Sequence, residues 1–407
     1  MRGMIAVAQT RSFKKAERVM VDVAGQPVSA KTLERVAGDV GLELAWRRDA
    51  DPRTDAALAQ RPALPPDLAV VECDGGRIRT RQPGHGPGVH LEGKGWNETK
   101  NACLIRAQRK TFGEDPQPDP PECFCDAQHV AKIAETEALS VAAPGTQEPC
   151  LPEEDEPAPP LPAADWRPKR LVRTVLASMA CSKEFGRQMA REAKRRRFAE
   201  AQAKAFLGDG LPWNWSIWKA DFADFTPILD FIHVLSYLFA AAKAVHPDSH
   251  ADAWDQYLVW MTGCWRGDIA QVLEELGAWG GELGPPPDGA ADNDPRQIVA
   301  TTVHYLTNNR ERMNYPRYRQ AGMPVTTSWM ESLVKSWMES LVKEINWRVK
   351  GTEMFWNNPD GAEALLQIRA AALSDDARLK THLQTRAGSP FTRRPKPPNV
   401  TQEKNKS

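Results

Sequence analysis

Two short apolar runs, far apart in the chain, each end in an aspartate beside glycine, and this constrains the fold more than any other feature. Residues 68–74 read Leu-Ala-Val-Val-Glu-Cys-Asp, and residues 203–210 read Ala-Lys-Ala-Phe-Leu-Gly-Asp-Gly. Apolar runs of this length bounded by Asp-Gly predict strands that end in a turn. The ends of separate strands can meet at one edge of a sheet, which would bring Asp74 and Asp209 together. The alternative is that each Asp-Gly only marks a turn.

Two carboxylates at one sheet edge have a chemical use. Hard oxygen ligands favour Mg²⁺ or Mn²⁺. Two such ions, roughly 3.5–4 Å apart, can stabilise both the attacking and the leaving oxygen of an in-line phosphoryl displacement. The pair Asp74 and Asp209 therefore indicates metal-dependent phosphoryl transfer.

The charges balance overall but are segregated along the chain. Lysine and arginine number 53, as do aspartate and glutamate. Residues 114–165 hold 13 acids against one lysine and 11 of the 33 prolines, so we expect an acidic linker or insertion with one helix near 126–140. Residues 167–197 hold 11 basic residues against two glutamates.

The basic segment predicts a charged helix face. Arg187, Arg191 and Arg195 recur at a spacing of four, and Lys194, Arg195, Arg196 and Arg197 follow one another. This stripe either is a solvated surface or contacts DNA phosphates. A second basic cluster, which includes Arg310 and Arg312, leaves the same two readings open.

Composition excludes secreted and membrane classes. The seven cysteines are odd in number and scattered, which fits a reducing compartment. The chain begins without an apolar leader, and its most apolar stretch, 227–245, contains Asp230, His233 and Lys243. We therefore expect a cytoplasmic, nucleoid-associated protein without membrane contact.

An exact tandem repeat occurs late in the chain. The octapeptide SWMESLVK fills residues 328–335 and again 336–343. Two structural repeats would have diverged, so we interpret the repeat as a recent in-frame duplication. It places two glutamates, Glu331 and Glu339, on a predicted helix over 324–350.

Six blocks, in this order, resemble those of bacterial insertion-sequence transposases. They are Cys-Asp74-Gly-Gly-Arg-Ile, Gly-Asp209-Gly-x-x-Trp-x-Trp, Asp230-x-x-His233, Tyr315-Pro-x-Tyr-Arg-x-x-Gly-x-Pro, Met-Glu-Ser-x-x-Lys and Arg348-x-Lys350-Gly-Thr-x-x-Phe-Trp356. The chain is most similar to the Kra-type group and more distantly to Mutator-like and hAT transposases, over residues 15–375.

The resemblance implies an α/β fold: an RNase H-like catalytic domain, with a mixed sheet flanked by helices, an all-helical insertion and a small N-terminal helical segment. The implied catalytic and metal-binding triad is Asp74, Asp209 and a glutamate, with Mg²⁺ or Mn²⁺. Asp230 and His233 match the family's C/D(2)H element. Implied partners are double-stranded DNA, as element ends and target, and further copies of the chain in a synaptic complex. Arg348 and Lys350 are expected to join the DNA-binding residues named above.

The expected organisation combines these segments. The parts are an N-terminal helical segment with a possible helix-turn-helix (1–50), the first part of the catalytic domain (65–112), the acidic linker (113–166), the basic helix with the second part (167–233), the helical insertion (234–322), the Glu-bearing helix with the C-terminal part (323–385) and a basic tail (386–407). The family also leaves room for a DNA-binding portion upstream of Met1.

The duplication leaves the third acid ambiguous. Eight residues of helix advance about 12 Å and turn about 80° net, so both glutamates cannot occupy one site in one register. Glu339 keeps its spacing to Arg348 and Lys350, whereas Glu331 keeps its spacing to Pro324. We favour Glu339, because a loop absorbs extra residues more easily than a packed helix. We also hypothesise that the insertion impairs activity. An inactive DNA-binding remnant and a structure-specific nuclease remain the alternatives.

Overall fold

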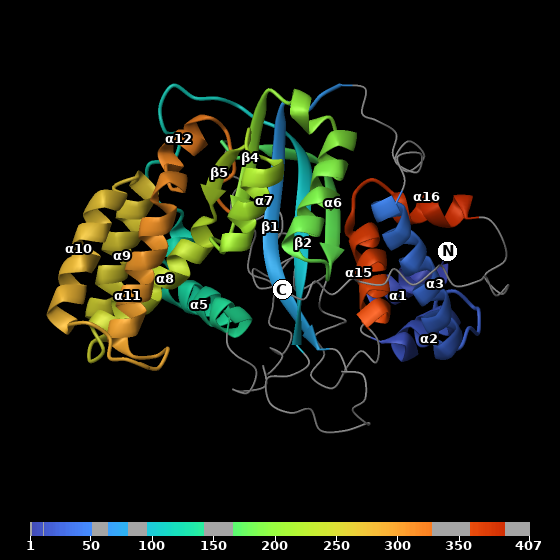
Figure 1. The fold of residues 1–407 in the computed structure, drawn as a ribbon, viewed down its shortest axis with the longest axis horizontal. Helices are drawn as coiled ribbons and strands as arrows, with labels where there is room; N and C mark the ends of the chain where they lie inside the picture. The colour runs from blue at the N-terminus through green and yellow to red at the C-terminus, as the bar shows by residue number, and fades with distance from the viewer. Residues whose placement is uncertain are drawn as a thin grey trace, which may run out of the picture.

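A five-stranded mixed sheet forms the centre of the molecule (Figure 1). The computed structural model describes residues 2–10, 12–50, 64–79, 96–141, 166–327 and 359–386. The strand order is β3-β2-β1-β4-β5, with antiparallel pairing from β3 to β1 and parallel pairing from β1 to β5. The strands are β1 (Leu68–Arg79), β2 (Trp96–Gln108), β3 (Lys169–Ser178), β4 (Ala203–Gly208) and β5 (Thr226–Leu229). The α/β class and the mixed sheet are thus confirmed.

Alternate residues of the strands pack into two separate cores. On one face, Ala69, Val71 and Cys73 of β1 meet the helices α6 (Ser182–Arg195) and α7 (Pro212–Asp221). On the other face, Leu68 and Val70 join the larger core, which includes α8 (Phe231–Val245) and α15 (Pro359–Leu373). Burial on both faces explains why β1 reads as a continuous apolar run.

The two ends of the described chain pack together beside the sheet (Figure 1). The N-terminal helices are α1 (Arg2–Gln9), α2 (Phe13–Asp22) and α3 (Ala30–Ala50), and the C-terminal ones are α15 and α16 (Arg378–Thr385). A Cβ at Gly41 of α3 would lie 2.1 Å from the Ala364 carbonyl oxygen of α15. Only glycine permits this contact, so α3 is one side of a tight helix pair. The expected N-terminal helices are therefore present.

A helical region follows β5 in the chain, as expected. It comprises α8, α9 (His250–Arg266), α10 (Ile269–Leu283), α11 (Pro295–Asn309), η3 (Arg310–Arg312) and α12 (Tyr315–Gln320). Trp260 and Trp265 are fully buried, and the Trp265 ring meets Phe231 edge-on at 5.0 Å between centroids. These tryptophans therefore stabilise the packing of the helices.

The first half of the acidic segment is packed, which agrees with an insertion and not with a free linker. A 3₁₀ turn, η1 (Glu122–Cys125), and α5 (Ala127–Val141) lie against the helical region, and Phe124 is buried there. The buried Arg319 guanidinium donates from Nε to Asp115 Oδ1 at 2.8 Å. The local composition predicts solvation, but this distant arginine holds the segment in place. The expected helix near 126–140 is confirmed; residues 142–165 lie outside the described ranges.

Strand β1 continues beyond Asp74. It runs on to Arg79 because β2 goes on pairing with it, from Asp74↔Asn101 to Arg79↔Trp96. The parallel neighbour β4 stops earlier, at Cys73↔Gly208. From Asp74 onward, therefore, β1 no longer pairs with β4 but still pairs with β2.

Within the residues that the structure describes, no helix is both long and apolar enough to cross a membrane.

Candidate functional site

The register of two parallel strands brings Asp74 and Asp209 together. The last paired residues of β1 and β4 are Cys73 and Gly208, and each is followed directly by an aspartate. The expectation that these carboxylates meet at one edge of the sheet is therefore confirmed. Asp209 is 8% exposed and Asp74 is half-buried, so the pair is partly shielded from solvent.

His233 from the first turn of α8 completes a group of three. One potential ligand atom from each of Asp74, Asp209 and His233 lies within 4.8 Å of the other two. Two carboxylates and an imidazole at this separation can share one cation. Such a group is also compatible with a site that binds no ion, because close carboxylates occur without metals.

Asp209 is held by three contacts that fix its backbone and carboxylate. Its Oδ1 accepts from the Leu211 amide at 2.8 Å and from the Asn214 side-chain amide, which comes from α7. The Tyr305 hydroxyl of α11 donates to the Asp209 carbonyl oxygen at 2.7 Å. Two hydrogen bonds donated to Oδ1 thus fix the orientation of the carboxylate.

Gly210 allows this approach of α11. Its φ is +97°, and a Cβ there would lie 2.5 Å from Tyr305 Cε2. An L side chain would therefore be strained in its backbone and would displace the tyrosine.

Asp230 orients the His233 ring by a hydrogen bond to its Nδ1. The carboxylate is fully buried and caps α8, with Oδ1 accepting from the Ile232 amide at 3.2 Å. Its Oδ2 lies 2.9 Å from His233 Nδ1. Metal-binding histidines commonly bond a carboxylate through the other ring nitrogen, which fixes the ring and its tautomer.

Thr327 adds two further donors to Asp230. Its amide lies 3.1 Å from Oδ1, and its hydroxyl lies 2.7 Å from Oδ2. A buried carboxylate with several hydrogen-bond donors is the arrangement in which a charge is tolerated inside a protein. The Asp230–His233 unit is therefore rigid.

The surrounding groups report a negative electrostatic environment. Burial raises the pKa of the Cys73 thiol, and the charges of Asp209 and Asp74 raise it further. Burial also raises the pKa of Tyr305, to which the charge of Asp209 adds. Both groups stay neutral at ordinary pH, so neither adds a further negative charge beside the two carboxylates.

The structure tests only part of the predicted residue set. It brings Asp74, Asp209, Asp230 and His233 together at the edge of the sheet. Glu331, Glu339, Arg348 and Lys350 lie outside the described residues, so the third acid and the C-terminal DNA contacts remain expectations.

The predicted basic stripe on α6 is partly wrong. Arg187 and Lys194 are exposed, as a DNA contact would need. Arg196 is 5% exposed and bonds Glu192 and Asp376, and Arg195 pairs with Glu192 at 3.0 Å.

The other basic residues of the prediction also have protein partners. Arg191 donates to the Arg48 carbonyl oxygen, and Arg197 pairs with Glu200. Helical spacing predicts which residues share a face, but it does not reveal carboxylates that come from elsewhere. In the second cluster, Arg310 is exposed, whereas the Arg312 guanidinium lies 4.4 Å from the Trp215 ring centroid.

Three residues of the site were missed from the sequence. Asn214 lies five residues after Asp209, but a single asparagine in a Trp-rich helix carries no signal of its own. Tyr305 and Thr327 are separated from their partners by 96 and 97 residues. Their roles follow from tertiary packing, in which α11 lies against α8 and α10, and α12 lies against α9, and local patterns do not predict it.

A comparison with protein-family models found no family that matches this chain, and a comparison with curated protein sequences found no match.

Proposed function

We propose that this chain is a metal-dependent DNA transposase of the DDE type, which cleaves and joins DNA at the ends of an insertion sequence. The convergence of Asp74, Asp209 and His233 within 4.8 Å carries the proposal. The six sequence blocks that resemble the family support it, because three of them supply this group and Asp230.

The donor set suits a divalent cation. In the proposal, Asp74 and Asp209 hold the metal with a glutamate from the duplicated segment, and His233 lies beside them. Carboxylates favour Mg²⁺ or Mn²⁺, and an imidazole nitrogen makes Mn²⁺ the better fit of the two. When bound, such ions supply Lewis-acid stabilisation of the oxygens in phosphodiester cleavage.

The chain's own residues position this chemistry. Asn214 and Leu211 fix the orientation of the Asp209 carboxylate by donating to its Oδ1, and Asp230 holds the His233 ring. Thr327, which bonds Asp230, immediately precedes the first SWMESLVK copy. Glu331 lies four residues after Thr327, and Glu339 lies twelve residues after it. Both glutamates are therefore candidates for the third acid.

The fold and partners are part of the same proposal. The mixed sheet with helices on both faces agrees with an RNase H-like catalytic domain, and the helical region after β5 agrees with the insertion expected before the glutamate. Exposed Arg187, Lys194 and Arg310 are the described basic residues best placed to meet double-stranded DNA. Assembly of several copies on paired DNA ends completes the proposal.

The test is cleavage of a plasmid that carries both ends of the element from which the chain derives, with Mg²⁺ or Mn²⁺. We expect nicked and joined products from the natural chain or, if the duplication impairs it, from a variant that lacks one octapeptide. Asp74→Asn and Asp209→Asn should each reduce cleavage roughly a hundredfold or more, since metal catalysis supplies several kcal/mol. One of Glu331→Gln and Glu339→Gln should do the same.

Asp248→Asn is the matched control, because this aspartate is exposed and lies on the helical region. It should cleave at the natural rate. Cleavage without joining would replace the proposal with a nuclease. If no version cleaves while all bind element ends, the chain is a DNA-binding protein without chemistry, and the proposal fails.

A further inference from the structure

A small cavity lies at the β3 edge of the sheet, away from the candidate site. Its volume is about 50 Å³, and it is enclosed by α3, α6, α15 and the start of α16. Its polar lining includes Arg48, Gln188, Arg191, Glu192, Arg195 and Arg378. None of these residues contributes to the Asp74–Asp209–His233 group.

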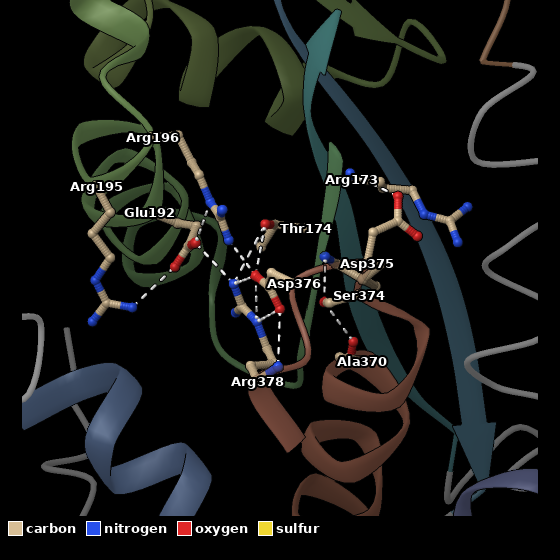
Figure 2. Close-up of polar contacts among 11 residues, drawn as sticks. Arg173, Thr174, Glu192, Arg195, Arg196, Ala370, Ser374, Asp375, Asp376 and Arg378 are labelled. Atoms are coloured by element: carbon tan, nitrogen blue, oxygen red, sulfur yellow. Dashed lines mark hydrogen bonds and ion pairs between the residues drawn. The ribbon is translucent and has the colours of Figure 1, made fainter. Parts of the chain in front are cut away.

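Arginines gather around this cavity. Figure 2 shows Glu192 on α6 between Arg195, Arg196 and Arg378, with Asp376 bonded to the last two. Arg48 pairs with Glu363, and Arg191 is bonded to a carbonyl oxygen. Among the described residues, this cluster brings together five arginines and three carboxylates.

Neighbouring charges also act on Arg195. Burial lowers its pKa to about 10, and the charges of Arg378 and Arg196 contribute to this lowering. Glu192 and Asp376, both labelled in Figure 2, each already accept from at least two arginines. An added anion would therefore be attracted to this group of arginines.

Gln188 supplies an independent sign that the cavity holds a polar ligand. Its side chain is 2% exposed and lines the cavity. Within the described part of the chain, neither its Nε2 nor its Oε1 has a hydrogen-bond partner. A buried amide without partners costs roughly 1–3 kcal/mol, so such groups usually meet a water or a ligand.

The volume of the cavity and its limited access to solvent favour a small ion. One buried water needs roughly 10–15 Å³ on this scale, so about 50 Å³ matches the four oxygens of a tetrahedral oxyanion. The side chains of Arg48 and Arg195 are each 12% exposed, and that of Arg378 is 16% exposed. A DNA backbone could not reach groups enclosed to this degree.

We propose that this cavity binds a phosphate-type oxyanion, held by Arg191, Arg195 and the amide of Gln188. The ion would connect α6 with α3 and α15, which come from opposite ends of the chain. This site is independent of the proposed transposase function, since neither needs the other.

Equilibrium dialysis of the full chain against radiolabelled inorganic phosphate tests the site, with chloride balancing the ionic strength. We expect saturable uptake of one phosphate per chain, displaced by sulfate and not by chloride. Arg191→Gln and Gln188→Leu should each weaken binding about tenfold or more, since hydrogen bonds to charged groups contribute roughly 1.5–3 kcal/mol.

The matched control is Arg187→Gln, one turn earlier on α6, whose side chain is exposed and does not line the cavity. It should bind phosphate as the natural chain does. The proposal is overturned if the folded natural chain takes up no phosphate, which would mean a cavity filled by water. Equal weakening by Arg187→Gln, or displacement of phosphate by a short DNA duplex, would also overturn it, because either result places the phosphate on the surface.

Discussion

The close approach of Asp74 and Asp209 predicts that the metal-free protein is under electrostatic strain. Their carboxylates lie within 4.8 Å of one another. Two unit charges at that separation repel by about 0.9 kcal/mol in bulk water and by about 3.5 kcal/mol at an effective dielectric constant near 20. Because Asp209 is nearly buried and Asp74 is half-buried, we expect a value between these limits. Asp74→Asn should therefore increase the free energy of unfolding by about 1–3 kcal/mol in the presence of a chelator.

Bound metal should make the natural chain more stable than the Asp74→Asn variant. An ion that binds only the folded chain adds about 2.7 kcal/mol at a hundred times its dissociation constant. The natural chain should gain this stability from Mn²⁺, and the Asp74→Asn variant should gain far less. Urea unfolding at pH 8, followed by tryptophan fluorescence with chelator or with Mn²⁺, measures both effects.

The exposed Asp248→Asn substitution serves as the control. It should change stability by no more than about 0.5 kcal/mol in either condition. The reasoning is refuted if Asp74→Asn destabilises the metal-free chain, or if Mn²⁺ stabilises the natural and Asp74→Asn chains equally.

Three further substitutions probe the packing around the two charged clusters. Gly210→Ala should destabilise the chain by about 1–3 kcal/mol from backbone strain alone, and it should abolish metal binding by displacing Tyr305; thermal unfolding and Mn²⁺ titration measure the two effects. Thr327→Val keeps the side-chain shape but removes a hydroxyl donor to the buried carboxylate that caps α8, so urea unfolding should show a loss of about 1.5–3 kcal/mol. Burial raises the pKa of Asp376, but the hydrogen bond and charge of Arg378 outweigh it and lower the pKa to about 2, so Asp376→Asn should cost about 2 kcal/mol at pH 7. Because the folded-state pKa is depressed, that difference from the natural chain should persist above pH 4 and vanish as the pH falls towards 2; a difference that grows on acidification would contradict it.

The central pair of the site could be predicted because its signal is local. Apolar runs that end in Asp-Gly predict both strands, and parallel neighbours place their ends together. The full length of β1 depends on its pairing with β2, which continues through Asp74↔Asn101 and beyond. A strand's end is set by its partners as much as by its own residues.

The supporting residues could not be predicted because their partners are distant in sequence. The basic run on α6 reads as a solvated stripe until Asp376, 180 residues later, is placed beside Arg196. The acidic segment reads as a linker until Arg319 is placed beside Asp115. In both cases an ion pair formed by tertiary packing overrides a charge pattern that composition alone interprets as exposed.

The occupancy of the site by metal tests the account most directly. Free Mn²⁺ has a characteristic electron paramagnetic resonance signal, so its loss on titration with the full chain counts the bound ions. The account predicts saturable Mn²⁺ binding by the natural chain that is lost in Asp74→Asn and in Asp209→Asn, weakened when His233 is changed to Ala, and unchanged in Asp248→Asn. Failure of the folded natural chain to bind Mn²⁺, or equal binding by the Asp209→Asn variant, would contradict it.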